Sequence, residues 1–403
     1  MRNDRGFPDP SIPLPVDASD AELEVLCQAH AANLYAWIAK ADSEQGESLT
    51  RTRYDGSVRS ACRIYQEHPF SRFRKVKHNT RKTYETSLKL IETTVGSRLI
   101  RNLNVLTVEY WYDQWRKGAV LVDDEGNETI GPERVDRAHD AVSMFKTVIY
   151  FMSALRHADC KLLASELEHV KFEKGGAREQ ELTYAHVTAF IRTALEFGQK
   201  GLMPQDRALY LAITTAAQFE LMVRQKDIIG DWAPKRADRV LPGGIGTLEL
   251  GSEIWTGFFT WENIPGWRWR MKTSKSKYRA PADFDLTKYT LLLPLLELVP
   301  EGESRTGAII KGEHGLPVRY RSFVKWWRKI ATAAGIPLDV ENMDARAGGA
   351  TEAEEAGATL EAIQGAMTHS KKEMTLNYIR RRTKKIADVA DLRNASRPAK
   401  KDR

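Results

Sequence analysis

Near its C-terminal end the sequence carries an arginine whose position suits it to bind an anion. Arg346 follows Asp344, a residue type that often caps helices, and Gly357 is suited to end the helix. Arg346 should therefore lie in the first helical turn, where free backbone N–H groups and the helix dipole favour a phosphate. The alternative is a surface arginine that pairs with Glu352 or another acid.

A histidine and a tyrosine follow this arginine at a short spacing. Ser370 and Glu373 have the spacing of a capping box, which predicts a helix that begins there and includes Tyr378. His369 then stands just before the helix, and Tyr378 comes nine residues after it. A single tyrosine on a helix usually packs in a core or at its rim, so the pair gains meaning only together with further residues.

Arginine, histidine, lysine and tyrosine side chains together suit attack on a phosphodiester. Two guanidinium groups can hold, in a fixed geometry, the non-bridging oxygens on which charge builds. A phenol, with a reference pKa of about 10, needs a cationic cluster or a nearby base before it attacks near neutral pH. An ammonium group close to other cations has a lowered pKa and can give a proton to the departing oxygen.

Composition places the chain among soluble globular proteins. Its 403 residues, 42% hydrophobic and 29% charged, predict two or three domains with substantial cores. No apolar stretch is long enough for a membrane span and 1–15 lacks a signal-peptide core, so we expect a cytoplasmic protein. The cysteines share no metal-ligand spacing, and Glu352, Glu354 and Glu355 should spread around a largely solvated helix. We therefore predict no metal site.

Positive charge is concentrated in two segments of a chain whose net charge is +7. Residues 371–403 hold twelve Lys or Arg against four acids, and residues 63–89 place basic side chains among Phe70, Phe73 and Tyr84. A charge run is often only a solvated face, but two clusters favour a polyanionic partner because basic side chains displace counterions from phosphates. The side chains that we expect to contact nucleic acid are Arg72, Arg74, Lys75, Lys77, Arg81 and Lys82.

Hydrophobic periodicity predicts a mainly α protein with a small antiparallel β-sheet, an α+β fold. Alternation over 239–285, where Trp267, Trp269 and Met271 alternate with charged residues, predicts short antiparallel strands. Residues 123–131 should form a polar loop, and 320–389 should be helical with turns at Gly335 and Gly357. Other helices are predicted at 20–41, 80–95, 108–115, 134–155, 183–197, 206–217 and 219–229.

These patterns divide the chain into five parts. Residues 1–60 form a partly helical extension, and 61–172 form an all-helical domain. The segment 173–181 is polar, contains glycines and lacks apolar anchors, which is typical of a linker. Residues 182–385 form the domain that holds the candidate chemistry, and 386–403 form a basic tail.

The order of arginine, lysine, arginine, histidine and tyrosine resembles that of the tyrosine recombinase (phage integrase) family. Residues 180–385 resemble its catalytic domain, and the helical region before them resembles its core-binding domain, which clamps DNA. Arg346, His369 and Tyr378 match the second arginine, the histidine and the nucleophilic tyrosine. Arg224 matches the first arginine, which the family places in a helix, and Asp227 would be its structural acid.

Two positions of the motif match the family less well than these four residues do. Lys272, followed by Thr273, best matches the lysine that the family carries on a β-hairpin, but Lys275 and Lys277 remain alternatives. The family's histidine before the second arginine is replaced here by Met343, which cannot transfer a proton.

The resemblance implies a site-specific recombinase that cuts and rejoins DNA through a 3′-phosphotyrosine link. No metal or nucleotide cofactor is expected, because the covalent intermediate keeps the energy of the phosphodiester. The implied partners are double-stranded DNA, other copies of the chain in a tetramer on paired DNA sites, and an accessory directionality protein. The alternatives are a DNA-binding protein of the same fold with weakened chemistry and a relaxing enzyme that resembles type IB topoisomerases.

Overall fold

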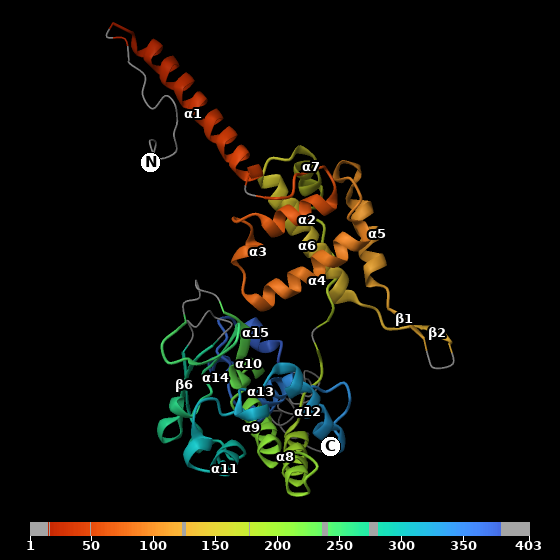
Figure 1. Ribbon diagram of the computed structural model, residues 1–403, viewed down its shortest axis with the longest axis vertical. Helices are drawn as coiled ribbons and strands as arrows, with labels where there is room; N and C mark the ends of the chain where they lie inside the picture. Colours follow the sequence, from red (N-terminus) through yellow and green to blue (C-terminus); the bar gives the residue numbers. More distant parts are fainter. Residues whose placement is uncertain are drawn as a thin grey trace, which may run out of the picture. The chain divides into compact units, whose positions relative to one another are not determined.

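The computed structural model describes residues 15, 17–48, 50–122, 126–176, 178–235, 241–273 and 281–379. The chain divides into two compact units, Met1–Gly176 and Ala177–Arg403, and each has its own hydrophobic core (Figure 1). The division falls inside the segment predicted as a linker. Lys275, Lys277 and the basic tail lie outside the described residues.

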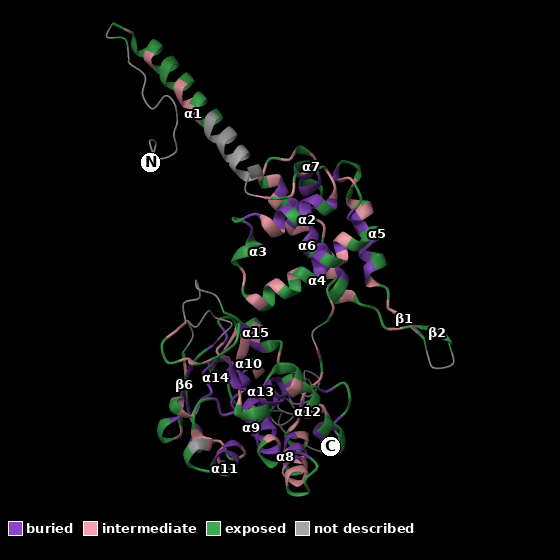
Figure 2. Ribbon diagram, in the orientation of Figure 1, coloured by how far each residue is buried: buried purple, intermediate pink, exposed green. Residues whose placement is uncertain are grey.

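Unit 1 is built around one central helix, α6, whose apolar residues recur every three or four positions. Phe145, Val148, Ile149 and Met152 of this helix are buried against α2, α4, α5 and α7. The buried faces of these helices turn toward one another, as the colours of Figure 2 show. The helices of unit 1 are α1 (Asp20–Ser48), α2 (Val58–Glu67), α3 (Arg72–Lys75), α4 (His78–Val95), α5 (Val105–Arg116), α6 (Val135–Ala154) and α7 (Ala158–Leu167).

A β-hairpin corrects the prediction that this unit is all-helical. Strands β1 (Val120–Val122) and β2 (Glu128–Ile130) pair antiparallel, with Val120 opposite Ile130, where we had predicted a polar loop over 123–131. The β-branched residues at both ends of the polar turn favour strand pairing. The prediction failed because three-residue strands are too short to show an alternating pattern.

Unit 2 combines helices with two small antiparallel sheets, which confirms the predicted fold class. One sheet has the strand order β3-β5-β4, and β6 and β7 form a separate hairpin. On β6, Trp269 and Met271 are buried while Arg268, Arg270 and Lys272 are exposed, so the predicted alternation is confirmed. The strands are β3 (Asp231–Pro234), β4 (Gly246–Leu250), β5 (Glu253–Gly257), β6 (Arg268–Lys272) and β7 (Pro281–Asp285).

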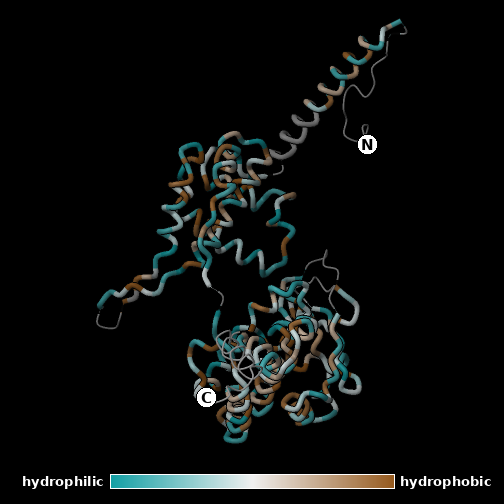
Figure 3. The backbone as a smooth tube through the Cα atoms, turned by 180° about the vertical axis from the view of Figure 1, so that it is seen from behind, coloured by the Kyte–Doolittle hydropathy of each residue, from teal (hydrophilic) through white to brown (hydrophobic). Residues whose placement is uncertain are grey.

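Helix α9 (Gln205–Glu220) is the scaffold of unit 2. Every residue from Ala208 to Phe219 is buried, and α8, α11 and α13 all pack against it. Hydrophobic and hydrophilic stretches alternate along the surrounding helices, as a half-buried layer requires (Figure 3). Those helices are α8 (Tyr184–Gln199), α10 (Gln225–Ile229), α11 (Leu292–Glu297), α12 (Tyr320–Ala333), α13 (Ala345–Glu355), α14 (Leu360–Ala366) and α15 (Lys372–Leu376).

The chain breaks where a continuous helix over 219–229 was predicted. Helix α9 ends at Glu220, and Met222 has a φ of 50°, a left-handed conformation that side chains rarely adopt. A new helix, α10, begins only at Gln225. The prediction was wrong because the apolar spacing continues through a change of chain direction.

Two glycines let α13 pack unusually close to its neighbours. A Cβ at Gly348 would lie 1.9 Å from the carbonyl oxygen of Leu182, and a Cβ at Gly349 would lie 2.0 Å from that of Phe219. The residues from Ala345 to Thr351 are all buried. The prediction that this helix is largely solvated was therefore wrong, because its glycines mark a buried contact and only its last turn is open.

We expect Gly348→Ala to lower the free energy of unfolding by about 3 kcal/mol, since overpacking against a fixed backbone costs about 1–3 kcal/mol and occasionally more. Gly365→Ala is the matched control, because Gly365 is also helical but has open space where its Cβ would be. That control should be neutral or stabilising by up to about 1 kcal/mol. Urea denaturation followed by circular dichroism measures both changes, and equal stabilities would refute the close packing.

Candidate active site

Arg346 lies in the first turn of α13, as predicted, and its guanidinium is buried, with only 3% of the residue exposed. Asp344 occupies the N-cap position but its side chain does not cap the helix. It instead accepts two hydrogen bonds from Arg178, at 3.1 and 2.8 Å, and one from the backbone N of Glu341 at 2.8 Å. Arg178 thus anchors the start of unit 2 to the helix that carries Arg346, through polar contacts in a segment that lacks apolar anchors.

The guanidinium of Arg346 contacts groups that follow α14 and α15 in the chain. Its Nη2 donates to the carbonyl oxygen of Met367 at 2.8 Å and lies 2.7 Å from His369 Nε2. Its central carbon lies 5.1 Å from the centre of the Tyr378 ring. The alternative, a surface arginine paired with Glu352, is therefore wrong. Its Nε has no acceptor among the described residues.

Arg224 is the N-cap of α10 rather than part of a helix. This corrects the prediction, and the extended backbone at this position follows from the break after α9. One guanidinium nitrogen, Nη1, lies 3.9 Å from the Asp227 carboxylate, one turn further along α10. Asp227 is itself buried. Asp227 therefore orients Arg224 toward the same part of unit 2 that contains Arg346.

His369 is held in place by the end of α14. Its backbone N donates to the carbonyl oxygen of Gln364 at 3.0 Å, and the Gln364 side chain donates to the carbonyl oxygen of His369 at the same distance. The residue before it, Thr368, has a φ of 55°. This turn buries the imidazole between Arg346 and Thr375, whose hydroxyl lies 3.0 Å from Nδ1.

Tyr378 lies in a turn after α15, so the prediction that a helix contains it was wrong. Helix α15 begins at Lys372 with no side-chain cap, so the predicted capping box of Ser370 and Glu373 does not form. The backbone N of Tyr378 donates to the carbonyl oxygen of Thr375 at 2.9 Å. This turn brings the phenol ring to 5.3 Å from the imidazole of His369, measured between ring centres.

The electrostatics of the cluster favour an added anion. Burial, and then the charge of Arg224, lower the pKa of Arg346 to about 10, although Tyr378 and Asp227 oppose the shift. The folded protein therefore binds this proton less tightly than the unfolded chain does. The charged guanidinium costs stability at all pH values below about 10, and an anion bound beside it would recover part of that cost.

Two motif positions lie apart from this cluster. Lys272 is exposed at the end of β6, where it pairs with Pro281 of β7, and no described contact joins it to Arg346. Met343 is 52% exposed, while its neighbour Asn342 is buried and accepts hydrogen bonds from the side-chain amides of Gln218 and Gln225. The side chain of Met343, at the position where the family has a histidine, is therefore largely exposed to solvent.

Sequence reasoning missed the residues that support the cluster. Asn342 and Gln225 connect the starts of α13 and α10, which carry the two arginines, and Thr375 contacts His369. The two glycines of α13 were a visible signal for close packing. The side-chain amides and the threonine are common residue types, and nothing in their spacing distinguishes them.

The predicted nucleic-acid contacts of unit 1 gather on and beside α3. Arg72, Arg74, Lys75, Lys77 and Lys82 are exposed. Arg81 differs, because it donates to the carbonyl oxygens of Phe73 and Arg74, at 3.2 and 3.0 Å, and so joins α4 to α3. The exposed side chains can meet a polyanion, while Arg81 is used within the fold.

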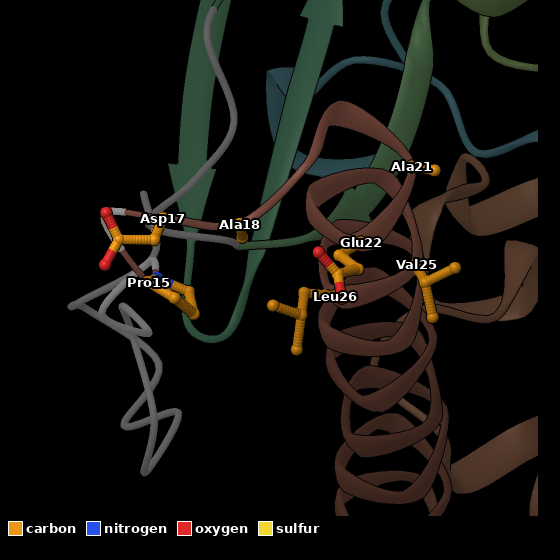
Figure 4. Close-up of a pocket in the computed structure, with 7 residues that line it drawn as sticks. All are labelled: Pro15, Asp17, Ala18, Ala21, Glu22, Val25 and Leu26. Atoms are coloured by element: carbon orange, nitrogen blue, oxygen red, sulfur yellow. The ribbon is translucent and has the colours of Figure 1, made fainter.

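Other features of the described residues do not enter the site. A hollow beside the first turn of α1 is lined by Pro15, Ala18, Glu22 and Leu26, among others, and contains no residue of the cluster (Figure 4). Within the described ranges, no group of three His, Cys, Asp or Glu side chains is arranged to hold a metal ion. No helix in the same ranges is long and apolar enough to cross a membrane.

We expect sulfate at about 10 mM to raise the Tm by about 2–4 °C over chloride of equal ionic strength, because it binds between the two arginines. Arg346→Gln should lose most of this shift. Arg321→Gln, which removes an exposed cation from α12, should keep it. Differential scanning fluorimetry measures these shifts, and an equal response in all three proteins would rule out the anion site.

Comparisons with known proteins agree with this fold. No protein-family model matches the sequence, and curated proteins gave no match. Among solved structures, the chain is similar to a fragment of the Tn1549 transposon integrase in complex with transposon right end DNA. The TM-score is 0.51 at 14% identity, over 83% of this chain and 99% of that one.

A second similarity is to residues 75–356 of lambda integrase. Its dimer bound to a COC′ core site matches with a TM-score of 0.50 at 13% identity, over 77% of this chain and 91% of the fragment. The same fragment bound to DNA matches with a TM-score of 0.50 at 12% identity. The two units of this chain therefore have the fold of these integrases, and the resemblance to tyrosine recombinases is confirmed at the level of the fold.

Proposed function

We propose that the protein is a site-specific DNA recombinase that cleaves and rejoins DNA through a 3′-phosphotyrosine intermediate. The observation that carries the proposal is the cluster of Arg346, His369 and Tyr378, with Arg224 close enough to shift the pKa of Arg346. Arg224 is distant in the sequence from the other three residues, and Arg346 and His369 are buried where the cluster forms. The integrases that share the fold were solved with DNA, which supports a DNA substrate.

The two arginines bind the scissile phosphate in this proposal. Arg346 Nε is buried without a protein acceptor in the described residues, and its charge adds to that of Arg224. Planar guanidinium groups match the non-bridging oxygens and stabilise the charge that builds on them in the transition state. The phosphate thus adds negative charge to that of the Asp227 carboxylate.

Cleavage exchanges one phosphorus–oxygen bond for another. The Tyr378 oxygen attacks phosphorus, its proton passes to His369 Nε2, and the bond to the deoxyribose 5′ oxygen breaks. The departing oxygen takes a proton from a lysine: Lys272 is our candidate, although it lies apart from the cluster in this structure, and Lys275 and Lys277 are alternatives outside the described residues. A 5′ hydroxyl then reverses the steps on the phosphotyrosine, so rejoining consumes neither a metal ion nor a nucleotide.

Unit 1 contributes DNA contacts through the exposed side chains on and beside α3. These contacts go to phosphates and position the duplex. The resemblance implies a tetramer on paired sites and an accessory protein that sets direction, and a DNA substrate implies a location with the nucleoid in the cytoplasm. The lambda integrase dimer on its core site supports more than one protomer per site.

A nicked suicide substrate tests the chemistry directly. The short fragment that carries the 5′ hydroxyl dissociates after cleavage, so rejoining cannot occur and the covalent adduct accumulates. We expect the full chain to give a slower band on a denaturing gel, and Tyr378→Phe to abolish it, since only the hydroxyl is removed. Tyr320→Phe, at an exposed tyrosine of α12, is the matched control and should retain the adduct.

The same assay separates the alternatives. A chain that binds DNA but forms no adduct would be the weakened DNA-binding protein, which Met343 favours because the residue offers no proton transfer. An adduct together with relaxation of plasmids that lack a second site would favour a topoisomerase-like enzyme.

We expect the triple variant Arg72→Ala, Arg74→Ala, Lys75→Ala to bind DNA more weakly and to lower the slope of log affinity against log salt by about 2–3, since each phosphate contact contributes about 0.9. The control removes Arg98, Arg101 and Lys161, which are exposed elsewhere on unit 1. Fluorescence anisotropy over a salt series measures the slopes. Equal slopes for the two triple variants would exclude α3 as the contact.

A further inference from the structure

Both ring nitrogens of His369 lie close to polar side chains of the described residues. Nε2 lies 2.7 Å from Arg346 Nη2, and Nδ1 lies 3.0 Å from the hydroxyl oxygen of Thr375. Both His369 and Thr375 are buried, and Thr375 is fully inaccessible. These two neighbours therefore both act on the protonation of the imidazole.

The chemistry of the neighbours selects one tautomer. A guanidinium has only donors, so Arg346 can meet Nε2 only if that nitrogen carries a lone pair. With Nε2 unprotonated, the proton of the neutral ring must be on Nδ1, where it donates to the Thr375 oxygen. Arg346 keeps its own proton near neutral pH, because even its lowered pKa is about 10.

We propose that Thr375 is a positioning residue that accepts the Nδ1 proton of His369 and so keeps the unprotonated Nε2 turned toward Arg346 and Tyr378. The kinetic consequence rests on the proposed function. When a phosphate takes the donors of Arg346, Nε2 is released from this contact, while the hydroxyl of Thr375 still accepts from Nδ1 and keeps the ring in its orientation. Nε2 can then accept the proton of the Tyr378 phenol, whose ring lies beside the imidazole.

The placement of Thr375 explains how this contact is kept. It lies in α15, six residues after His369, and its carbonyl oxygen accepts from the backbone N of Tyr378 at 2.9 Å. One residue thus touches the histidine with its side chain and the turn of the tyrosine with its backbone. The backbone contact survives any substitution by a similar side chain, so the hydroxyl can be tested alone.

The first test reads the tautomer without any DNA. In the full chain labelled with ¹⁵N-histidine, long-range ¹H–¹⁵N correlation spectra distinguish Nδ1–H from Nε2–H rings, and His369→Gln identifies the His369 signals among nine histidines. We expect the Nδ1–H pattern in the unchanged protein and in Thr375→Ser. With sulfate present to take the donors of Arg346, Thr375→Val should shift His369 toward Nε2–H, because Nδ1–H has lost its acceptor, and an unchanged pattern in that variant would overturn the proposal.

The second test reads the chemical step. Thr375→Val should slow adduct formation on the nicked substrate by about 10- to 100-fold, at the lower end of what a proton acceptor contributes. DNA affinity should stay the same, and Thr375→Ser should restore the rate to within about threefold. Thr214→Val controls for loss of a buried hydroxyl, because the Thr214 hydroxyl donates to the carbonyl oxygen of Tyr210 within α9.

The two tests fail independently. If the unchanged protein forms no adduct, the proposed function fails, while the spectra still decide the tautomer. If adduct forms at the same rate in Thr375→Val and in the unchanged protein, the positioning role is wrong even though the chemistry is right.

Discussion

A buried guanidinium has to be satisfied by its surroundings, and this requirement organises the candidate active site. Arg346 is almost inaccessible, yet its charge is opposed by the nearby charge of Arg224. A charge removed from water is costly unless it is paired and hydrogen-bonded. The carbonyl of Met367, the imidazole of His369 and the face of Tyr378 supply part of that pairing. What remains unmet is negative charge, which a backbone phosphate can provide.

One helix fixes the relative positions of the two arginines. The buried helix α9 ends just before the break that leads to Arg224, and α13 packs against its last residues through Gly348 and Gly349. Because an added methyl group would collide with backbone at either glycine, the approach of the two elements has little freedom. The amide of Asn342 accepts from Gln218 of α9 and from Gln225 beside Arg224, which adds a second connection. The arrangement is therefore set by packing before any ligand arrives.

The sequence predicted the fold class, the first-turn position of Arg346 and the alternation on β6, because each depends on local patterns. It could not show that Tyr378 lies in a turn, since the end of a short helix depends on contacts with other elements. It also predicted a polar loop where the pair β1 and β2 forms, because three-residue strands carry no periodic signal. The residues that contact His369 could not be predicted for a different reason. Which threonine meets an imidazole is decided by tertiary packing and not by spacing along the chain.

The central claim is that the oxygen of Tyr378 becomes bonded to a phosphorus of the DNA backbone. Peptide mapping by mass spectrometry, after reaction with a nicked duplex and nuclease digestion, locates that bond most directly. We expect the peptide containing Tyr378 to gain the mass of a 3′-linked nucleotide, with the modification on the phenol. A nucleotide found on any other residue, or none in a protein shown to bind the duplex, would contradict it.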